Sequence, residues 1–171
     1  MPSRSAGASF RSRLVAYRLS LYSALLNRIQ TLSFLLRESP IVKDVPIGAR
    51  GRAAETVKFQ HTLTAHHSSL PPVYSTPDMI RLMETAAFHA LQPYCEGDEI
   101  TVGTSIHVEH RAASGIGACI TAEAAVESFD GRFYTVRVSA SEGAQEIGRG
   151  TVGRAVVSVS MFAARMRKME G

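Results

Sequence analysis

From residue 54 onward, the hydrophobic positions change period twice, from alternation to helical spacing and back to alternation. The first alternating run covers residues 57–63 and predicts a strand. Four later alternating runs predict strands at residues 100–110, 120–127, 134–140 and from about 145 to 159. Asp130-Gly131, between the second and third of these runs, predicts a tight hairpin turn. The tail from Met161 is expected to be a short helix.

A single long helix is expected between the first strand and the other four. Thr76 suits the N-cap, Pro77 suits the first helical position and Asp78 suits the first turn. The apolar stripe then recurs at helical spacing, at Ile80, Met83, Ala87 and Leu91. Pro93 ends the helix.

The order of these elements predicts an α+β fold, because one helix stands among about five antiparallel strands. One helix cannot cover both faces of such a sheet, so the sheet should curve around the helix on one face. A second copy of the chain would protect the rest, and a homodimer is expected. This arrangement, one central helix wrapped by a curved sheet, is a hotdog fold.

Residues 1–40 differ from the rest of the chain. They are rich in Ser, Arg and Leu, and no acidic residue precedes Glu38. This N-terminal extension is expected to be helical, and its composition is typical of a targeting segment or a membrane-surface helix. The ordinary alternatives are a non-native extension or a helix that lies on the domain. Residues 41–53 are expected to be a linker, which leaves residues 54–171 as the domain.

Composition and charge narrow the class of protein. The 171 residues are 45% hydrophobic and 20% charged, as in an ordinary globular domain. The net charge is +4, but residues 1–37 carry six arginines; without them 13 basic residues face 15 acidic ones, a net charge of −2. This argues against nucleic-acid binding. No apolar run approaches the ~20 residues of a membrane span, and the two cysteines fit a reducing, cytoplasmic setting.

Three polar side chains interrupt this pattern where chemistry could occur. Thr76 opens the helix, Glu84 lies two turns later on its apolar stripe, and His110 ends a strand on the same face as Ile106 and Val108. A hydroxyl, a carboxylate and an imidazole are the groups that acyl-transfer chemistry uses. Each also has a structural interpretation: a helix cap, a carboxylate at the edge of the stripe, and a core histidine.

Thr76 and Glu84 are also too far apart for a direct contact. Eight helical residues separate them by roughly 12 Å. A shared site therefore needs the chain to fold back before the helix, or a second subunit.

Other signals are weaker. Residues 148–153 match G-x-G-x-x-G, but a strand follows where a nucleotide site needs a helix. His61, His66 and His67 lack a carboxylate or thiol at ligand spacing, so no metal site is expected. Arg154 stands alone in a β-branched strand and could reach an anionic group or form a surface ion pair.

From about Glu55 to Met166 the sequence resembles the hotdog-fold acyl-CoA thioesterases, above all the fluoroacetyl-CoA thioesterase-like family. The segments that carry the similarity are residues 74–84, 102–110 and 146–156. The resemblance implies that Thr76, Glu84 and His110 are the catalytic residues. It also implies that Gly103 lines the thioester site and that Arg154 lies near the acyl pocket.

The resemblance implies a thioester hydrolase that takes coenzyme A thioesters as substrate and needs no cofactor. In the loop before the helix, His67 and Leu70 occupy the places of the family's aromatic lid residues, so the fluoroacetyl preference is not expected to transfer. One alternative is a non-catalytic acyl-CoA-binding or regulatory hotdog domain, against which the intact set of Thr76, Glu84 and His110 argues. Another is a related hotdog hydratase or dehydratase, but the Asp/His pairing typical of those enzymes is not found in this sequence. The location is expected to be cytoplasmic, unless residues 1–37 direct the chain to an organelle.

Overall fold

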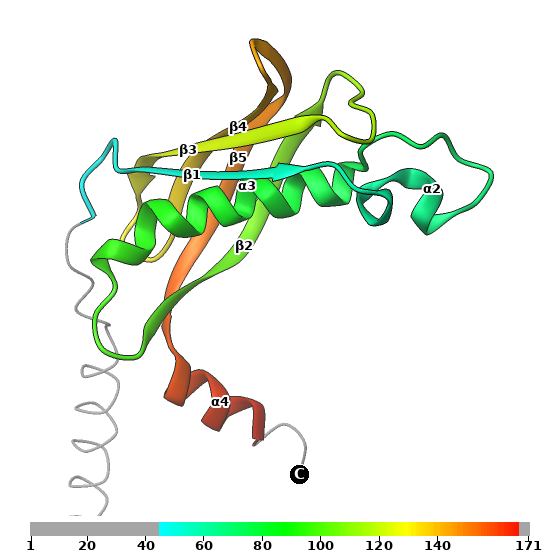
Figure 1. Cartoon of the computed structure of the whole chain (residues 1–171). Coiled ribbons are helices and arrows are strands. Elements are labelled where there is room, and N and C mark those ends of the chain that lie inside the picture. Colours follow the sequence, from blue (N-terminus) through cyan, green and yellow to red (C-terminus); the bar gives the residue numbers. More distant parts are fainter. Residues whose placement is uncertain (1–44, 168–171) are drawn as a thin grey trace, which may run out of the picture. The chain divides into compact units, whose positions relative to one another are not determined.

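The computed structural model describes residues 45–167 of the chain. Five strands and three helices follow one another, with two short 3₁₀ turns between them (Figure 1). The elements are β1 (Arg50–Thr56), η1 (Phe59–His61), α2 (Leu63–His66), α3 (Thr76–Leu91), η2 (Gln92–Tyr94), β2 (Glu99–His110), β3 (Cys119–Phe129), β4 (Tyr134–Glu142), β5 (Gln145–Ser158) and α4 (Val159–Arg167).

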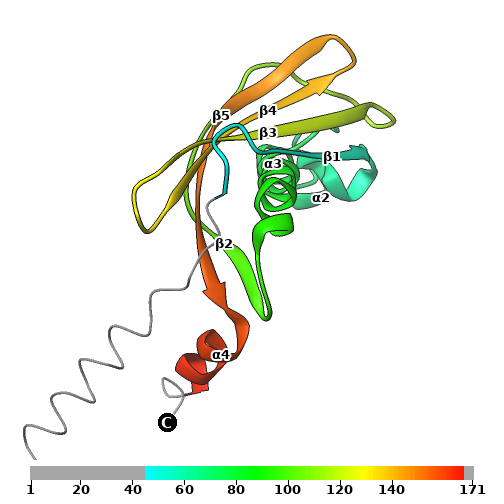
Figure 2. The same cartoon turned by 90° about the vertical axis from the view of Figure 1, so that its left-hand side faces the viewer.

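All five strands form one antiparallel sheet in the order β1-β3-β4-β5-β2. The sheet curves around α3, which lies along its inner face, as Figure 2 shows in a view close to the helix axis. This confirms the predicted fold, in which one central helix is wrapped by a curved sheet of five strands. β1 and β2 are the edge strands, and β2 leaves one side of its backbone unpaired within the described chain.

The core lies between α3 and the inner face of the sheet. Seven helix residues are buried: Met79, Leu82, Met83, Ala86, Ala87, Ala90 and Leu91. Facing them are apolar residues of β3, β4 and β5, among them Ile120, Val136, Val138 and Val152, each at most 1% exposed. The packing is closest at Gly51, where an added Cβ would overlap the backbone of Ala86 and Ala90. The small residues of β1 therefore let the helix approach the sheet directly.

The strand predicted at residues 57–63 is wrong. Residues 59–61 form η1 and residues 63–66 form α2, while the first strand, β1, covers residues 50–56. Residues 50–53, assigned to a linker from the sequence, are thus the first half of β1. Val57 is buried but Phe59 is 58% exposed, so the alternating residues do not share one core face. Gly51, Ala53 and Ala54 hid the true strand because small residues have low strand propensity.

A bulge in β2 changes which side chains face the helix. The pairing of β2 with β5 shifts between Gly103 and Ser105. Before the shift, Thr101 and Gly103 pair with inward-facing residues of β5; after it, Ile106, Val108 and His110 do so. Strict alternation along the predicted strand at residues 100–110 would place Ile100 and Val102 on the same face as Ile106 and Val108. The structure does not, since a bulge inserts one residue into the alternation.

The ends of the chain complete the description. The predicted N-terminal extension at residues 1–40 lies outside the described residues. At the other end, α4 confirms the predicted helical tail, and none of its residues is buried. Within residues 45–167, no helix combines the length and the apolar character that a membrane crossing requires.

Candidate functional site

The helix cap at the start of α3 is Ser75 rather than the predicted Thr76. The Ser75 hydroxyl accepts a hydrogen bond from the backbone N–H of Asp78 at 3.2 Å and donates one to its carboxylate at 2.6 Å. Thr76 is thus the first helical residue, and its hydroxyl does not serve as the cap. Its side chain is available for another partner.

That partner is His110, at the end of β2. Thr76 Oγ1 and His110 Nδ1 share a hydrogen bond of 3.0 Å. The other ring nitrogen, Nε2, is buried and has no hydrogen-bond partner among the described residues. A buried polar atom without a partner is costly, so it commonly marks a position where a ligand, a water molecule or a second chain completes the site. The structure therefore brings two of the three predicted residues together and leaves one ring nitrogen open.

Glu84 lies two turns further along α3, beside Gly103 of β2. An added Cβ at Gly103 would overlap Glu84 Oε1, so the glycine makes room for the carboxylate. The Glu84 side chain is 33% exposed, which means that one side of the carboxylate remains open to solvent. Two of the predicted residues, Glu84 and Gly103, thus lie together on the inner face, at a second position apart from the Thr76–His110 pair.

Arg154 secures this second position from β5. Its guanidinium is almost fully buried and lies 3.6 Å from Glu84 Oε1. It also donates to Thr101, to Oγ1 at 3.0 Å and to the carbonyl oxygen at 2.8 Å, and its third nitrogen donates to the Glu84 carbonyl at 3.4 Å. Burial lowers the pKa of Arg154, and the negative charge of Glu84 opposes that shift. Arg154 therefore points inward as a clamp on α3 and β2 rather than toward solvent.

The two positions are separate within one chain. Thr76 and Glu84 lie eight residues apart on a continuous helix, roughly 12 Å at 1.5 Å per residue. Glu84 contacts Arg154 and the backbone at Gly103, whereas His110 contacts Thr76. As the sequence indicates, the three residues do not form one hydrogen-bonded triad within a chain.

The predicted lid positions lie in the loop between α2 and α3. Leu70 is 42% exposed. His67 Nδ1 lies 2.8 Å from the hydroxyl of Ser69, so this ring contacts its own loop. Neither residue contacts Thr76, Glu84 or His110 through a hydrogen bond or ion pair.

Sequence reasoning missed a polar cluster beside the start of α3. The Tyr74 ring is 1% exposed, and its hydroxyl donates to Glu55 Oε1 at 2.6 Å. The second oxygen of Glu55 accepts from Arg81, which also lies 3.6 Å from Asp78. Burial, and then the bond to Glu55, raise the pKa of Tyr74. The sequence feature that could have predicted this cluster is Glu55 itself, a carboxylate on the helix-facing side of β1.

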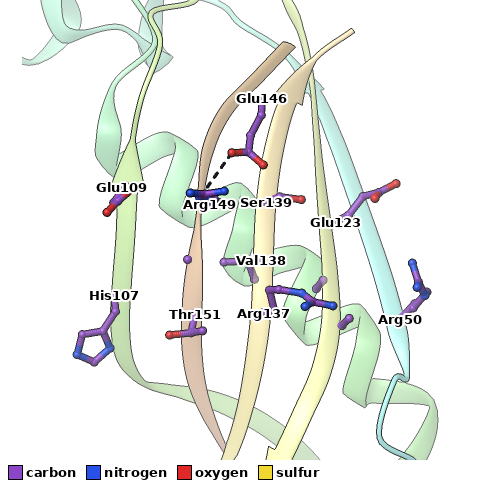
Figure 3. A pocket seen from close by; sticks show the side chains of 13 residues that line it. Arg50, His107, Glu109, Glu123, Arg137, Val138, Ser139, Glu146, Arg149 and Thr151 are labelled. Atoms are coloured by element: carbon purple, nitrogen blue, oxygen red, sulfur yellow. Dashed lines mark ion pairs between the residues drawn. The ribbon is translucent and has the colours of Figure 1, made fainter. Parts of the chain in front are cut away.

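The outer face of the sheet carries a different kind of surface. A shallow hollow there is lined by Arg and Glu side chains of β1, β2, β3, β4 and β5, with α3 behind the sheet (Figure 3). Arg149 pairs with Glu146 at 3.8 Å within it. None of the predicted site residues lines this hollow. The candidate chemistry is therefore confined to the inner face.

Comparison with known proteins identifies the family. Residues 57–160 match the family described as fluoroacetyl-CoA-specific thioesterase. A fluoroacetyl-CoA thioesterase from Streptantibioticus cattleyicolor is 39% identical over 114 residues, which cover 67% of this chain and 82% of that protein. The chain belongs to the fluoroacetyl-CoA-specific thioesterase family, and its class of enzyme is acyl-CoA thioesterase, as predicted.

Solved structures agree with this assignment. A structure of fluoroacetyl-CoA thioesterase superposes with a TM-score of 0.66 at 36% identity, covering 72% of this chain and 96% of that one. A hot-dog-like protein from Thermanaerovibrio acidaminovorans has a TM-score of 0.68 at 22% identity, covering 74% of this chain and 93% of that one. The second likeness supports the hotdog fold alone.

Proposed function

We propose that this chain hydrolyses an acyl-CoA thioester at a site shared between two copies, with Thr76 and His110 from one copy and Glu84 from the other. The observation that carries the proposal is the hydrogen bond between Thr76 and His110, together with the unpartnered Nε2 on the far side of the same ring. Family membership supports the thioester substrate.

The free edge of β2 supports the shared site. An unpaired strand edge is a template for a second chain, and antiparallel pairing of two β2 edges would continue the sheet through a twofold axis. Ile106, on the inner face of β2, is 44% exposed and would be covered by such pairing. Antiparallel pairing reverses the strand, so the part of β2 at Gly103, beside which Glu84 of α3 lies, approaches the partner subunit's His110.

The roles of the three residues follow from their atoms. The Thr76 hydroxyl donates a hydrogen bond to His110 Nδ1, so the ring proton is on Nε2 and points at the substrate or at the partner subunit's Glu84. Glu84 attacks the thioester carbonyl carbon, or removes a proton from a water molecule that attacks it. When the carbon–sulfur bond breaks, the Nε2–H of His110 donates a hydrogen bond to the departing sulfur and the ring stays neutral. The proton that makes coenzyme A a thiol comes from the water molecule that hydrolyses the thioester or the acyl-enzyme.

The carbonyl oxygen gains negative charge during this attack and needs hydrogen-bond donors. The backbone N–H groups near Gly103 and at the start of α3 are suitable donors, because helix N-termini stabilise negative charge. If Glu84 attacks directly, a water molecule then hydrolyses the acyl-enzyme to the free acid. If water attacks the thioester, the free acid forms in that step. The proposal needs no metal and no other cofactor.

A thiol-release assay tests the function. A panel of acyl-CoAs, from short to long chains and including fluoroacetyl-CoA, is offered to the wild-type protein and to Glu84→Gln. Turnover that is lost in Glu84→Gln, with affinity for the same acyl-CoA retained in calorimetry, supports the proposal and gives the acyl preference. Binding without turnover in the wild type would instead indicate a non-catalytic acyl-CoA-binding domain. Glu123→Gln, an exposed position on the outer face, is the matched control.

A further inference from the structure

Tyr74 connects the two segments that carry Thr76 and His110. It lies two residues before Thr76, and its backbone N–H donates to the carbonyl of Ser114 at 2.8 Å, in the loop that follows His110. The adjacent Val73 also bridges to Gly115 in that loop. Any movement of Tyr74 therefore moves the Thr76 hydroxyl relative to the ring that it contacts.

The far end of the Tyr74 side chain is held by Glu55. The Tyr74 ring is buried, and its hydroxyl donates a hydrogen bond to Glu55 Oε1 at 2.6 Å. Arg81 of α3 holds the other oxygen of the same carboxylate. The Glu55 carboxylate thus ties Tyr74 to β1 and to α3 at once.

Glu55 is an unusual choice for its position. The helix-facing residues of β1 are Gly51, Ala53 and Glu55, and the first two are small and apolar. A carboxylate in a partly buried place loses hydration, and apolar replacements of ion pairs are often equally stable. Stability of the fold alone therefore does not explain why a carboxylate is present at position 55. A need to hold the Tyr74 hydroxyl in one orientation does explain it.

We infer that Glu55 and Tyr74 are positioning residues for the Thr76–His110 pair. This inference rests on the proposed function and deepens it. Neither side chain is expected to touch the substrate. Glu55 fixes the Tyr74 hydroxyl, and Tyr74 fixes the distance between Thr76 Oγ1 and His110 Nδ1.

Steady-state kinetics of Tyr74→Phe and Glu55→Gln give the first test. Both variants are expected to lower kcat about tenfold, since small misplacements of reacting groups have effects of this order or larger, with KM within about twofold. Tyr94→Phe, a partly buried tyrosine at the opposite end of α3, is the matched control and should keep wild-type kcat. An unchanged kcat in both variants would overturn the inference.

A double-mutant cycle separates positioning from a general structural role. If Tyr74 acts through Thr76, then Tyr74→Phe should cause no further loss in a Thr76→Ala background, because coupled residues are not additive. Losses that multiply in that background would mean a general effect on the fold and would contradict the inference.

A spectroscopic measurement keeps the test independent of activity. With ¹⁵N-labelled histidine, the neutral His110 ring of the wild type should carry its proton on Nε2, and His110→Gln assigns the signal. In Tyr74→Phe the two tautomers should mix; a tautomer identical to the wild type would overturn the inference. If the wild-type protein hydrolyses no acyl-CoA, the proposed function fails, yet this measurement still decides the role of Tyr74.

Discussion

Gly103 provides the space that the carboxylate of Glu84 occupies. An added Cβ at residue 103 would overlap Glu84 Oε1, the end of a flexible side chain, while no backbone atom lies as close. The glycine is therefore needed for the position of the Glu84 carboxylate and much less for the fold.

Gly103→Ala should accordingly inactivate the protein without unfolding it. The methyl group displaces the Glu84 carboxylate, and a misplacement of about 1 Å can cost ~100-fold in rate. Thiol release measures the loss, and thermal unfolding should show a Tm close to the wild type. Gly115→Ala is the control, because nothing lies within 4 Å of its added Cβ. Full activity in Gly103→Ala would show that Glu84 does not act from this position.

Arg154→Met should destabilise the protein. Arg154 makes three hydrogen bonds and one ion pair from a buried position, and its loss leaves Thr101 and Glu84 without those donors. Thr101 is buried, and leaving a buried acceptor without its donor costs about 1–3 kcal/mol. Chemical denaturation measures the free energy of unfolding. Arg149→Met, on the outer face, should change the free energy of unfolding by less than about 1 kcal/mol. Equal losses in the two variants would contradict the role of Arg154 in holding α3 and β2 together.

Two inactive variants should restore activity when they are combined. In a dimer of Glu84→Gln and His110→Gln, one of the two shared sites keeps an intact Glu84 and an intact His110. After subunit exchange of equal amounts, about a quarter of the wild-type activity is expected, since half of the dimers are mixed and each has one complete site. Neither variant alone should be active. No recovery, with exchange shown by labelled subunits, would mean that each site is built from one chain.

Acid should weaken the start of α3 through Asp78. Burial works against the charged form, but hydrogen bonds from Ser75 and His66 outweigh it and hold the pKa of Asp78 below its usual range. A carboxyl with a lowered pKa in the folded state stabilises that state above its unfolded pKa of about 3.9 and loses this contribution as pH falls further. Chemical denaturation from pH 6 to pH 3 should therefore show a smaller loss of stability in Asp78→Asn than in the wild type. Parallel curves would contradict this role.

The sequence predicted the parts of the fold in which local signals and tertiary packing agree. The α3 helix, its end near Pro93 and the hairpin at Asp130-Gly131 all have strong local patterns, and each occurs in the structure. β1 was missed because its small residues fit a closely packed helix, which is a tertiary requirement. At residues 57–63 a local pattern predicted a strand that the structure does not contain. The alternation there has no matching tertiary packing, since Phe59 is exposed.

The candidate site was predicted as a set of residues but not as an arrangement. Its hydroxyl, carboxylate and imidazole could be selected by chemistry and spacing. The contact between Thr76 and His110 depends on how the loop before α3 meets the end of β2, and no local pattern encodes that. The inward direction of Arg154 depends on Thr101, which the bulge in β2 turns toward the helix.

The β2 bulge also has a consequence for insertions and deletions. Gly103 and His110 are seven positions apart, an odd number, and in a regular strand residues an odd number of positions apart point to opposite faces. Only the extra residue near Thr104 places both on the inner face. Removing one residue there would leave a sheet with nearly the same backbone pairing and every side chain type retained, but with its two functional positions on opposite sides. We therefore expect the length of this strand to matter for activity as much as the identity of its residues.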